Sequence, residues 1–119
     1  MAETQELKGG CHCGAVRFTV ATDMAMVIEC NCSHCAKKGF ILTFAPAEQF
    51  TLEQGEDSLT DYRFNTHKLR HRFCRVCGVQ SFAEGAGKDG PPTRAVNLRC
   101  VDGLDVKTLN PTAWDGASA

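Results

Sequence analysis

The fold is decided by two short stretches, Gly9-Gly10-Cys11-His12-Cys13-Gly14 and Cys74-Arg75-Val76-Cys77-Gly78. Each carries two cysteines on a turn that glycine allows to be tight, and the second has the Cys-x-x-Cys-Gly pattern of a zinc knuckle. Four thiolates complete a tetrahedral Zn²⁺ site and leave no position for a substrate. We therefore expect one structural zinc on Cys11, Cys13, Cys74 and Cys77. Iron in the same four-sulfur cage is the alternative.

A third cysteine group, Cys30-Asn31-Cys32-Ser33-His34-Cys35, lies between these two turns. Three thiolates on one loop can hold a single ion and leave its fourth position open for water or for a substrate thiol. We therefore predict a second zinc, labile and catalytic, on Cys30, Cys32 and Cys35. A redox dithiol formed by Cys32 and Cys35 is the other interpretation of this spacing.

The sequence gives weaker indications of a role in metal binding or catalysis for the remaining cysteine and the histidines. Cys100 falls on an alternating apolar pattern and is expected to be a small core residue rather than a ligand. His34 directly precedes Cys35, so both could coordinate one ion only with strain, and we expect an exposed His34 that carries protons. His71 is a second candidate for proton transfer, and His12 is interpreted as incidental.

Composition narrows the functional classes. The chain has 119 residues, which fits one domain over 1–119, and a net charge of −1, which gives no general attraction to nucleic acid. No run of about 20 apolar residues is present, so no membrane span is expected, and residues 1–8 have no apolar run of the kind a signal peptide needs. Eight cysteines in clusters favour metal chemistry in a reducing cytoplasm over disulfides. Oligomeric state has no sequence signal.

Basic residues surround two of the cysteine clusters. They are either a solvated face that balances the charge of zinc–thiolate centres or a docking site for substrate carboxylates, for which arginine is the best partner. The set consists of Lys37, Lys38, His67, Lys68, Arg70, His71, Arg72 and Arg75.

Apolar residues alternate with polar ones in short runs about ten residues apart, which is typical of an all-β protein. We expect small antiparallel sheets packed over each other, a helical turn over 33–38 that ends at Gly39, and a frayed tail over 113–119. A turn is expected at 65–68 and a loop at 85–92. The expected strands cover residues 15–21, 24–29, 40–44, 50–53, 59–64, 69–73, 79–83 and 95–100.

Four motifs in order resemble the glutathione-dependent formaldehyde-activating enzyme family, which includes the centromere protein V-like group. They are Gly10–Phe18, Cys30–Cys35, Phe73–Gly78 and Val96–Gly103, and the resemblance runs over a core of about residues 7–110. It implies an Mss4-like fold, a structural zinc on the outer cysteine pairs and a labile zinc on the central triplet. The activity it implies is condensation of formaldehyde with glutathione to S-hydroxymethylglutathione, a carbon–sulfur lyase reaction in reverse.

The sequence also departs from the family pattern. The chain is shorter than the named enzyme, Asn31 stands where many relatives have histidine, and Ala36-Lys37-Lys38 replaces an arginine-rich stretch. Our hypothesis is a zinc-dependent carbon–sulfur lyase that acts on an adduct of a small thiol, such as glutathione, with a small aldehyde. The alternative is a non-catalytic zinc module that binds a protein partner or switches with redox state.

Overall fold

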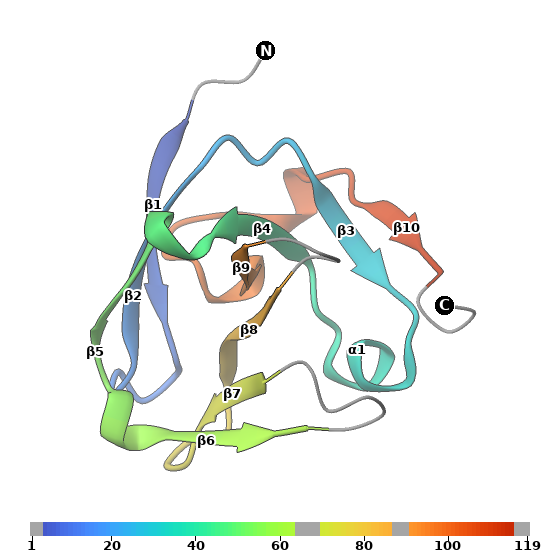
Figure 1. The fold of residues 1–119 in the computed structure, drawn as a ribbon. Coiled ribbons are helices and arrows are strands. Elements are labelled where there is room, and N and C mark those ends of the chain that lie inside the picture. Colours follow the sequence, from blue (N-terminus) through green and yellow to red (C-terminus); the bar gives the residue numbers. More distant parts are fainter. Residues whose placement is uncertain (1–3, 64–69, 87–90, 116–119) are drawn as a thin grey trace.

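The described strands of the computed structural model, which covers residues 4–63, 70–86 and 91–115, form two sheets (Figure 1). The smaller sheet is antiparallel and has the order β1-β2-β5. Its strands are β1 (Gln5–Gly10), β2 (Arg17–Thr22) and β5 (Phe50–Gln54). Figure 1 shows these three strands side by side along one flank of the molecule.

The larger sheet has seven strands in the order β10-β3-β4-β9-β8-β7-β6. All of its pairings are antiparallel except β10 with β3. Its strands are β3 (Val27–Cys30), β4 (Leu42–Pro46), β6 (Leu59–Tyr62), β7 (Arg70–Cys74), β8 (Gln80–Ala86), β9 (Pro92–Asn97) and β10 (Thr112–Trp114).

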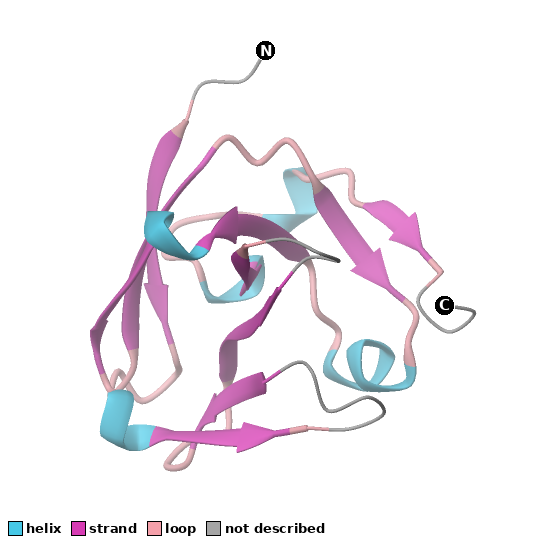
Figure 2. Cartoon of the chain, viewed as in Figure 1, coloured by secondary structure: helices cyan, strands magenta, loops and turns pink. Residues whose placement is uncertain are grey.

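Helical structure is confined to short pieces (Figure 2), so the all-β prediction is confirmed. The α-helix α1 (Ser33–Lys38) follows β3 and ends at Gly39, as predicted. The 3₁₀ turns cover Ala47–Gln49, Glu56–Ser58, Leu98–Cys100 and Val106–Thr108. The arrangement is consistent with the Mss4-like fold that the family resemblance implies.

The main core lies where the small sheet packs on the large one. Phe18 and Val20 alternate with partly buried neighbours on β2 and are almost fully buried, as the sequence pattern predicts. They pack with Val96 and Leu98, and the ring of Phe18 stacks on Phe50 with 5.4 Å between centroids. Such an apolar cluster supplies most of the folding free energy of a domain this small.

Several strand boundaries differ from the prediction. β3 begins at Val27 rather than at residue 24, because the φ of +53° at Met24 is not an extended conformation. β9 ends at Asn97 because its side-chain oxygen accepts from the Arg99 N–H at 3.1 Å and starts a 3₁₀ turn where a strand to residue 100 was expected. The expected turn at 65–68 lies outside the described residues.

The prediction is wrong at three other places. Gly9 and Gly10 end a strand, β1, that the sequence pattern did not reveal. The expected loop over 85–92 is wrong at its two ends, because Gly85 pairs with Thr93 and Ala86 with Pro92 in the ladder between β8 and β9, and its middle, 87–90, lies outside the described residues. The expected tail is wrong at its start, since Thr112–Trp114 forms the parallel pair with β3, and 116–119 lies outside the described residues.

A buried arginine joins three elements of the large sheet. Arg72 on β7 is 7% exposed, and its guanidinium donates to Asp61 on β6 at 3.0 Å and to Glu84 on β8 at 3.1 Å. A third carboxylate, Glu56, lies 3.0 Å from its Nη2. Although partial burial opposes it, hydrogen bonds from Arg70 and Arg72 lower the pKa of Asp61. Arg70 and Arg72 are thus engaged by acidic side chains of the protein itself, an arrangement that neither interpretation of the basic residues anticipated.

We predict that Arg72→Met lowers the free energy of unfolding by about 3 kcal/mol, because it removes a buried cation from three carboxylates, two of which are partly buried. The matched control is Arg17→Met, which removes a single exposed ion pair with Asp102 and should cost less than about 1 kcal/mol. Urea unfolding of both variants measures the difference. Equal losses in the two variants would contradict the role given to Arg72.

Candidate metal centres

The four outer cysteines come together from two turns far apart in the sequence. Cys11 and Cys13 lie between β1 and β2, Cys74 ends β7, and Cys77 lies between β7 and β8. All four sulfur atoms lie within 4.8 Å of one another, and the Sγ atoms of Cys13 and Cys74, separated by 61 residues, are 3.7 Å apart. This group, called the outer cluster below, could hold a metal ion.

The backbone of each turn directs N–H groups at the sulfurs. The amide of Val16 lies 3.3 Å from Cys11 Sγ, and that of Val76 lies 3.4 Å from Cys74 Sγ. The turns end at Gly14 and Gly78, whose φ values of +84° and +81° are disfavoured for other residues. Partial burial works against ionisation at Cys77, but backbone hydrogen bonds lower its pKa to about 6. Such N–H groups stabilise thiolates, the form that binds metal.

The outer cluster is also a small core that joins the two sheets. Cys11 and Cys74 are buried together with Val16. Leu52 from β5 and Leu59 from β6 pack against them, so residues of both sheets surround the sulfurs. A metal ion at this position would tie the two sheets together.

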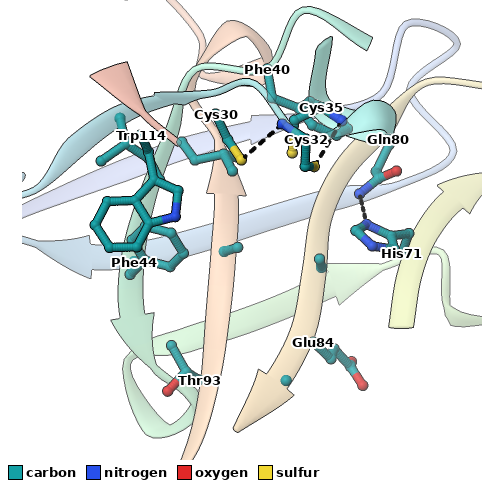
Figure 3. A pocket seen from close by; sticks show the side chains of 15 residues that line it. Cys30, Cys32, Cys35, Phe40, Phe44, His71, Gln80, Glu84, Thr93 and Trp114 are labelled. Carbon is teal, nitrogen blue, oxygen red and sulfur yellow. Dashed lines mark hydrogen bonds between the residues drawn. The ribbon is translucent and has the colours of Figure 1, made fainter. Parts of the chain in front are cut away.

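The central cysteines form the second group, called the triplet below. Cys30 ends β3, Cys32 caps the N-terminus of α1, and Cys35 lies in its first turn. Their sulfurs also lie within 4.8 Å of one another. Figure 3 shows the two bonds that fix them: the Cys32 N–H lies 3.4 Å from Cys30 Sγ, and the Cys35 N–H lies 3.3 Å from Cys32 Sγ. The triplet could hold a second metal ion from one short segment.

A cavity of about 330 Å³ opens beside the triplet (Figure 3). The three cysteines lie at one end of it, with Trp114 and Phe44 on one side and His71 and Gln80 on the other. The outer cluster has no part in its lining. Of the two cysteine groups, the triplet is therefore the one placed to meet a small molecule.

The rings of the two histidines near the triplet, His34 and His71, contact each other in a tilted arrangement, with centroids 4.1 Å apart and planes inclined by 47°. His34 is half-buried, so the expectation of an exposed side chain is wrong; its ring also stacks on Tyr62. His71 is buried, and the Gln80 amide donates to its Nδ1 at 3.2 Å. Burial, reinforced by the charges of His34 and Lys38, lowers the pKa of His71 to about 4.

Cys100 lies outside both cysteine groups, packs against the main core and donates from Sγ to the Gln80 carbonyl at 3.7 Å. This arrangement agrees with its interpretation as a core residue. His12 is exposed between two cysteines of the outer cluster. Lys37 and Lys38 line a separate groove on another side of α1, together with Tyr62 and Phe73.

Sequence reasoning missed the contribution of the C-terminal strand to this site. The Asn31 N–H donates to the Trp114 carbonyl at 3.0 Å, and the Asn31 side-chain amide donates to Asp115 at 3.0 Å. The strand β10 thereby holds the middle of the triplet segment and brings Trp114 to the cavity wall. The only sequence signal was a tryptophan in a stretch otherwise taken for a tail.

The fold and the site define a class: a small all-β domain with a four-sulfur and a three-sulfur group, each able to hold a metal ion. A family model described as glutathione-dependent formaldehyde-activating enzyme matches residues 6–115, and the chain belongs to this family. A crystal structure of a Rhodobacter sphaeroides protein is similar, with a TM-score of 0.79 and 32% identity. That match covers 90% of this chain and 98% of the other. In the described ranges, no helix has the length and apolar character to span a bilayer.

The two groups should differ in their effect on stability. Cys77→Ser opens the long metal-closed loop between the two turns, whose Cys13 and Cys74 are 61 residues apart, so we predict a melting temperature lower by about 8 °C or more and the loss of one bound metal ion. Cys32→Ser also removes one metal ion but opens only a local loop, so its melting temperature should fall by no more than about 4 °C. Metal analysis and thermal unfolding test both. A larger fall for Cys32→Ser would reverse the roles.

His71 should make the fold sensitive to acid. Unfolding returns its pKa from about 4 to 6.5, so the unfolded chain binds more protons between these values, and stability is full above pH 6.5 and falls below it. About 2 kcal/mol of this contribution should disappear between pH 7 and pH 5. His71→Gln should lose less stability than the wild type over that interval in urea unfolding. Equal losses would mean that other groups govern the acid response.

Proposed function

We propose that this protein is a zinc-dependent enzyme of the carbon–sulfur lyase type that acts on a thiol–aldehyde adduct. The named family reaction, formation of S-hydroxymethylglutathione from glutathione and formaldehyde, is the reference case. The observation that carries the proposal is a group of three sulfurs, with no fourth cysteine, that faces a cavity. Cysteine thiolates of this kind fit a reducing cytoplasm, where we place the protein.

The donor set of both groups fits zinc, because thiolates in groups of three or four suit this soft, tetrahedral ion. Cys11, Cys13, Cys74 and Cys77 would hold a structural zinc, and Cys30, Cys32 and Cys35 a labile one. When bound to the triplet, zinc would supply a Lewis acid with one open position that favours the thiolate form of a substrate. Binding of the reactants, exclusion of water and proton transfer would come from side chains of the protein.

In the condensing direction the reaction forms one bond, breaks one π bond and transfers one proton. The substrate sulfur attacks the carbonyl carbon, a carbon–sulfur bond forms, the carbonyl π bond breaks, and the proton of the thiol ends on the new hydroxyl. The chain must hold both reactants together, which alone contributes greatly to the rate. Phe40 and Trp114 flank the triplet and reduce the access of water to the reacting atoms.

His71 is the side chain that we assign to proton transfer. It lines the same cavity as the triplet, and the bond from Gln80 to Nδ1 leaves the proton of the neutral ring on Nε2. A neutral imidazole can accept a proton from a thiol and return it to an alkoxide, which is the exchange this reaction needs. The ring of His34 packs against that of His71 in a tilted contact and holds it in place.

One observation favours a second function, redox switching within a non-catalytic zinc module. Cys32 and Cys35 form a Cys-x-x-Cys pair at the start of α1, with the Cys35 N–H directed at Cys32 Sγ. This arrangement is also used by thiol–disulfide proteins. It predicts a reversible loss of two thiols on mild oxidation and no turnover of thiol–aldehyde adducts.

Cys32→Ser tests the proposed function. We expect the variant to bind one zinc ion fewer and to lose at least about 99% of the turnover of S-hydroxymethylglutathione, a loss of about 2.7 kcal/mol in transition-state stabilisation. The decay of the adduct is followed by NMR, and zinc is measured by elemental analysis. Cys100→Ser is the matched control, because it changes a cysteine outside both groups, and it should keep both activity and zinc.

Unchanged turnover in Cys32→Ser, with one zinc ion fewer, would rule out a catalytic role for the triplet. Turnover absent from the wild type itself, together with a reversible loss of two thiols on oxidation, would favour the redox module instead.

A further inference from the structure

We propose that the natural substrate carries an apolar group, aromatic or branched aliphatic, and that this group lies in the cavity beside the triplet. The place of this group in a reaction rests on the proposed function. The preference for an apolar group rests on the cavity alone. The inference narrows the thiol or aldehyde to a hydrophobic one and disfavours glutathione as the preferred ligand.

Small residues on two neighbouring strands, β8 and β9, make room for the cavity. Ala83 on β8 pairs directly with Ala95 on β9, and Gly85 pairs with Thr93 one step further along the same ladder. All four residues line the cavity. Directly paired strand residues have side chains on the same face of a sheet, so two alanines opposite each other leave a hollow that larger side chains would fill.

Large apolar side chains surround this hollow. Phe40 and Phe44 line it from the segment that begins β4, and Trp114 lines it from β10, at the far edge of the sheet. Ile28 and Leu42, neighbours across β3 and β4, also contribute. Phe44 pairs with Ala95, so an aromatic ring borders the hollow directly. A volume of about 330 Å³ is at the small end of the range for ligand sites.

The charges around the cavity do not suit glutathione. Among the described lining residues, the only side chain of an acidic or basic residue other than histidine is Glu84, and its carboxylate already accepts from Arg70 at 3.2 Å and from Arg72 at 3.1 Å. Glutathione has two carboxylates, which bind best to arginine or lysine. Lys37 and Lys38 line a different groove. A charged tripeptide would therefore bring anionic groups to a site without a cation to receive them.

An uncharged aromatic group of a ligand would bind favourably in the cavity. Moving roughly 100 Å² of apolar surface from water into the cavity favours binding by about 25 cal/mol per Å², which corresponds to a factor of about 70 in the dissociation constant. Part of this gain is lost to ordering of the ligand. We therefore expect a preference of at least about tenfold for an aromatic thiol over a charged thiol of similar reactivity.

The chain provides its own reporter for the test. Trp114 is the only tryptophan in the sequence, and it lines the cavity while 53% of its surface is exposed. Zinc-loaded protein is titrated with benzyl mercaptan and, separately, with glutathione, and tryptophan fluorescence is recorded with calorimetry in parallel. We expect the dissociation constant of benzyl mercaptan to be lower by at least about tenfold.

A filled cavity should abolish the preference. Ala95→Leu places a larger side chain in the hollow and should weaken the binding of benzyl mercaptan by at least about tenfold, with glutathione changed by less than about twofold. Ala21→Leu is the matched control, because it makes the same change on β2, away from the cavity, and should leave both affinities unaltered. If Ala95→Leu does not fold, Trp114→Ala removes part of the wall from a half-exposed position, and calorimetry should show a similar loss.

Two outcomes would overturn the inference: glutathione binding as tightly as benzyl mercaptan, or cavity variants that bind benzyl mercaptan like the wild type. Turnover of the hydroxymethyl adducts of both thiols is measured in the same samples and reports on the proposed function separately. If neither adduct reacts while benzyl mercaptan still binds in an Ala95-dependent way, the proposed function fails and the assignment of the cavity to an apolar group is supported.

Discussion

The meeting of four sulfurs from two distant turns is the constraint on which the rest of the structure depends. Cys13 and Cys74 are separated by 61 residues, and their Sγ atoms lie 3.7 Å apart. The contact joins the turn between β1 and β2 of the small sheet to the end of β7, next to the edge strand of the large sheet, so it fixes how the sheets face each other. A chain of this size buries a limited core, and a metal-closed loop of such length restricts the unfolded chain most effectively.

Both cysteine groups offer thiolate ligands, but the outer cluster draws them from two distant turns and the triplet from one short segment. The outer cluster is enclosed by apolar residues from both sheets, and its ligand positions are filled by the chain. The triplet comes from six consecutive residues at the junction of β3 and α1, so its sulfurs are set by local backbone geometry. A local site can lose or exchange its ion without loosening the sheets. We therefore propose that stability and reactivity belong to different sulfurs.

Cysteine spacing was sufficient to predict both groups, because metal ligation needs particular atoms at short separations in the chain. Alternation of apolar residues was sufficient for β2, whose Phe18 and Val20 face the core. It failed for β1 and β10, which have few buried residues and owe their conformation to a neighbouring strand. The burial of His34 could not be predicted either, because the rings that cover it, those of His71 and Tyr62, belong to strands far away in the sequence.

The strand β10, which the sequence pattern did not predict, connects the triplet to the cavity. β10 is exposed and short, and few apolar contacts hold it, yet the Asn31 N–H bonds to the carbonyl of Trp114 and the Asn31 amide bonds to Asp115. The same strand therefore positions the segment between Cys30 and Cys32 and supplies one wall of the ligand space. Any displacement of β10 changes the shape of the cavity and the geometry of the sulfurs together. An apolar group held against Trp114 would resist such a displacement, so occupancy of the cavity and order in the triplet are physically coupled.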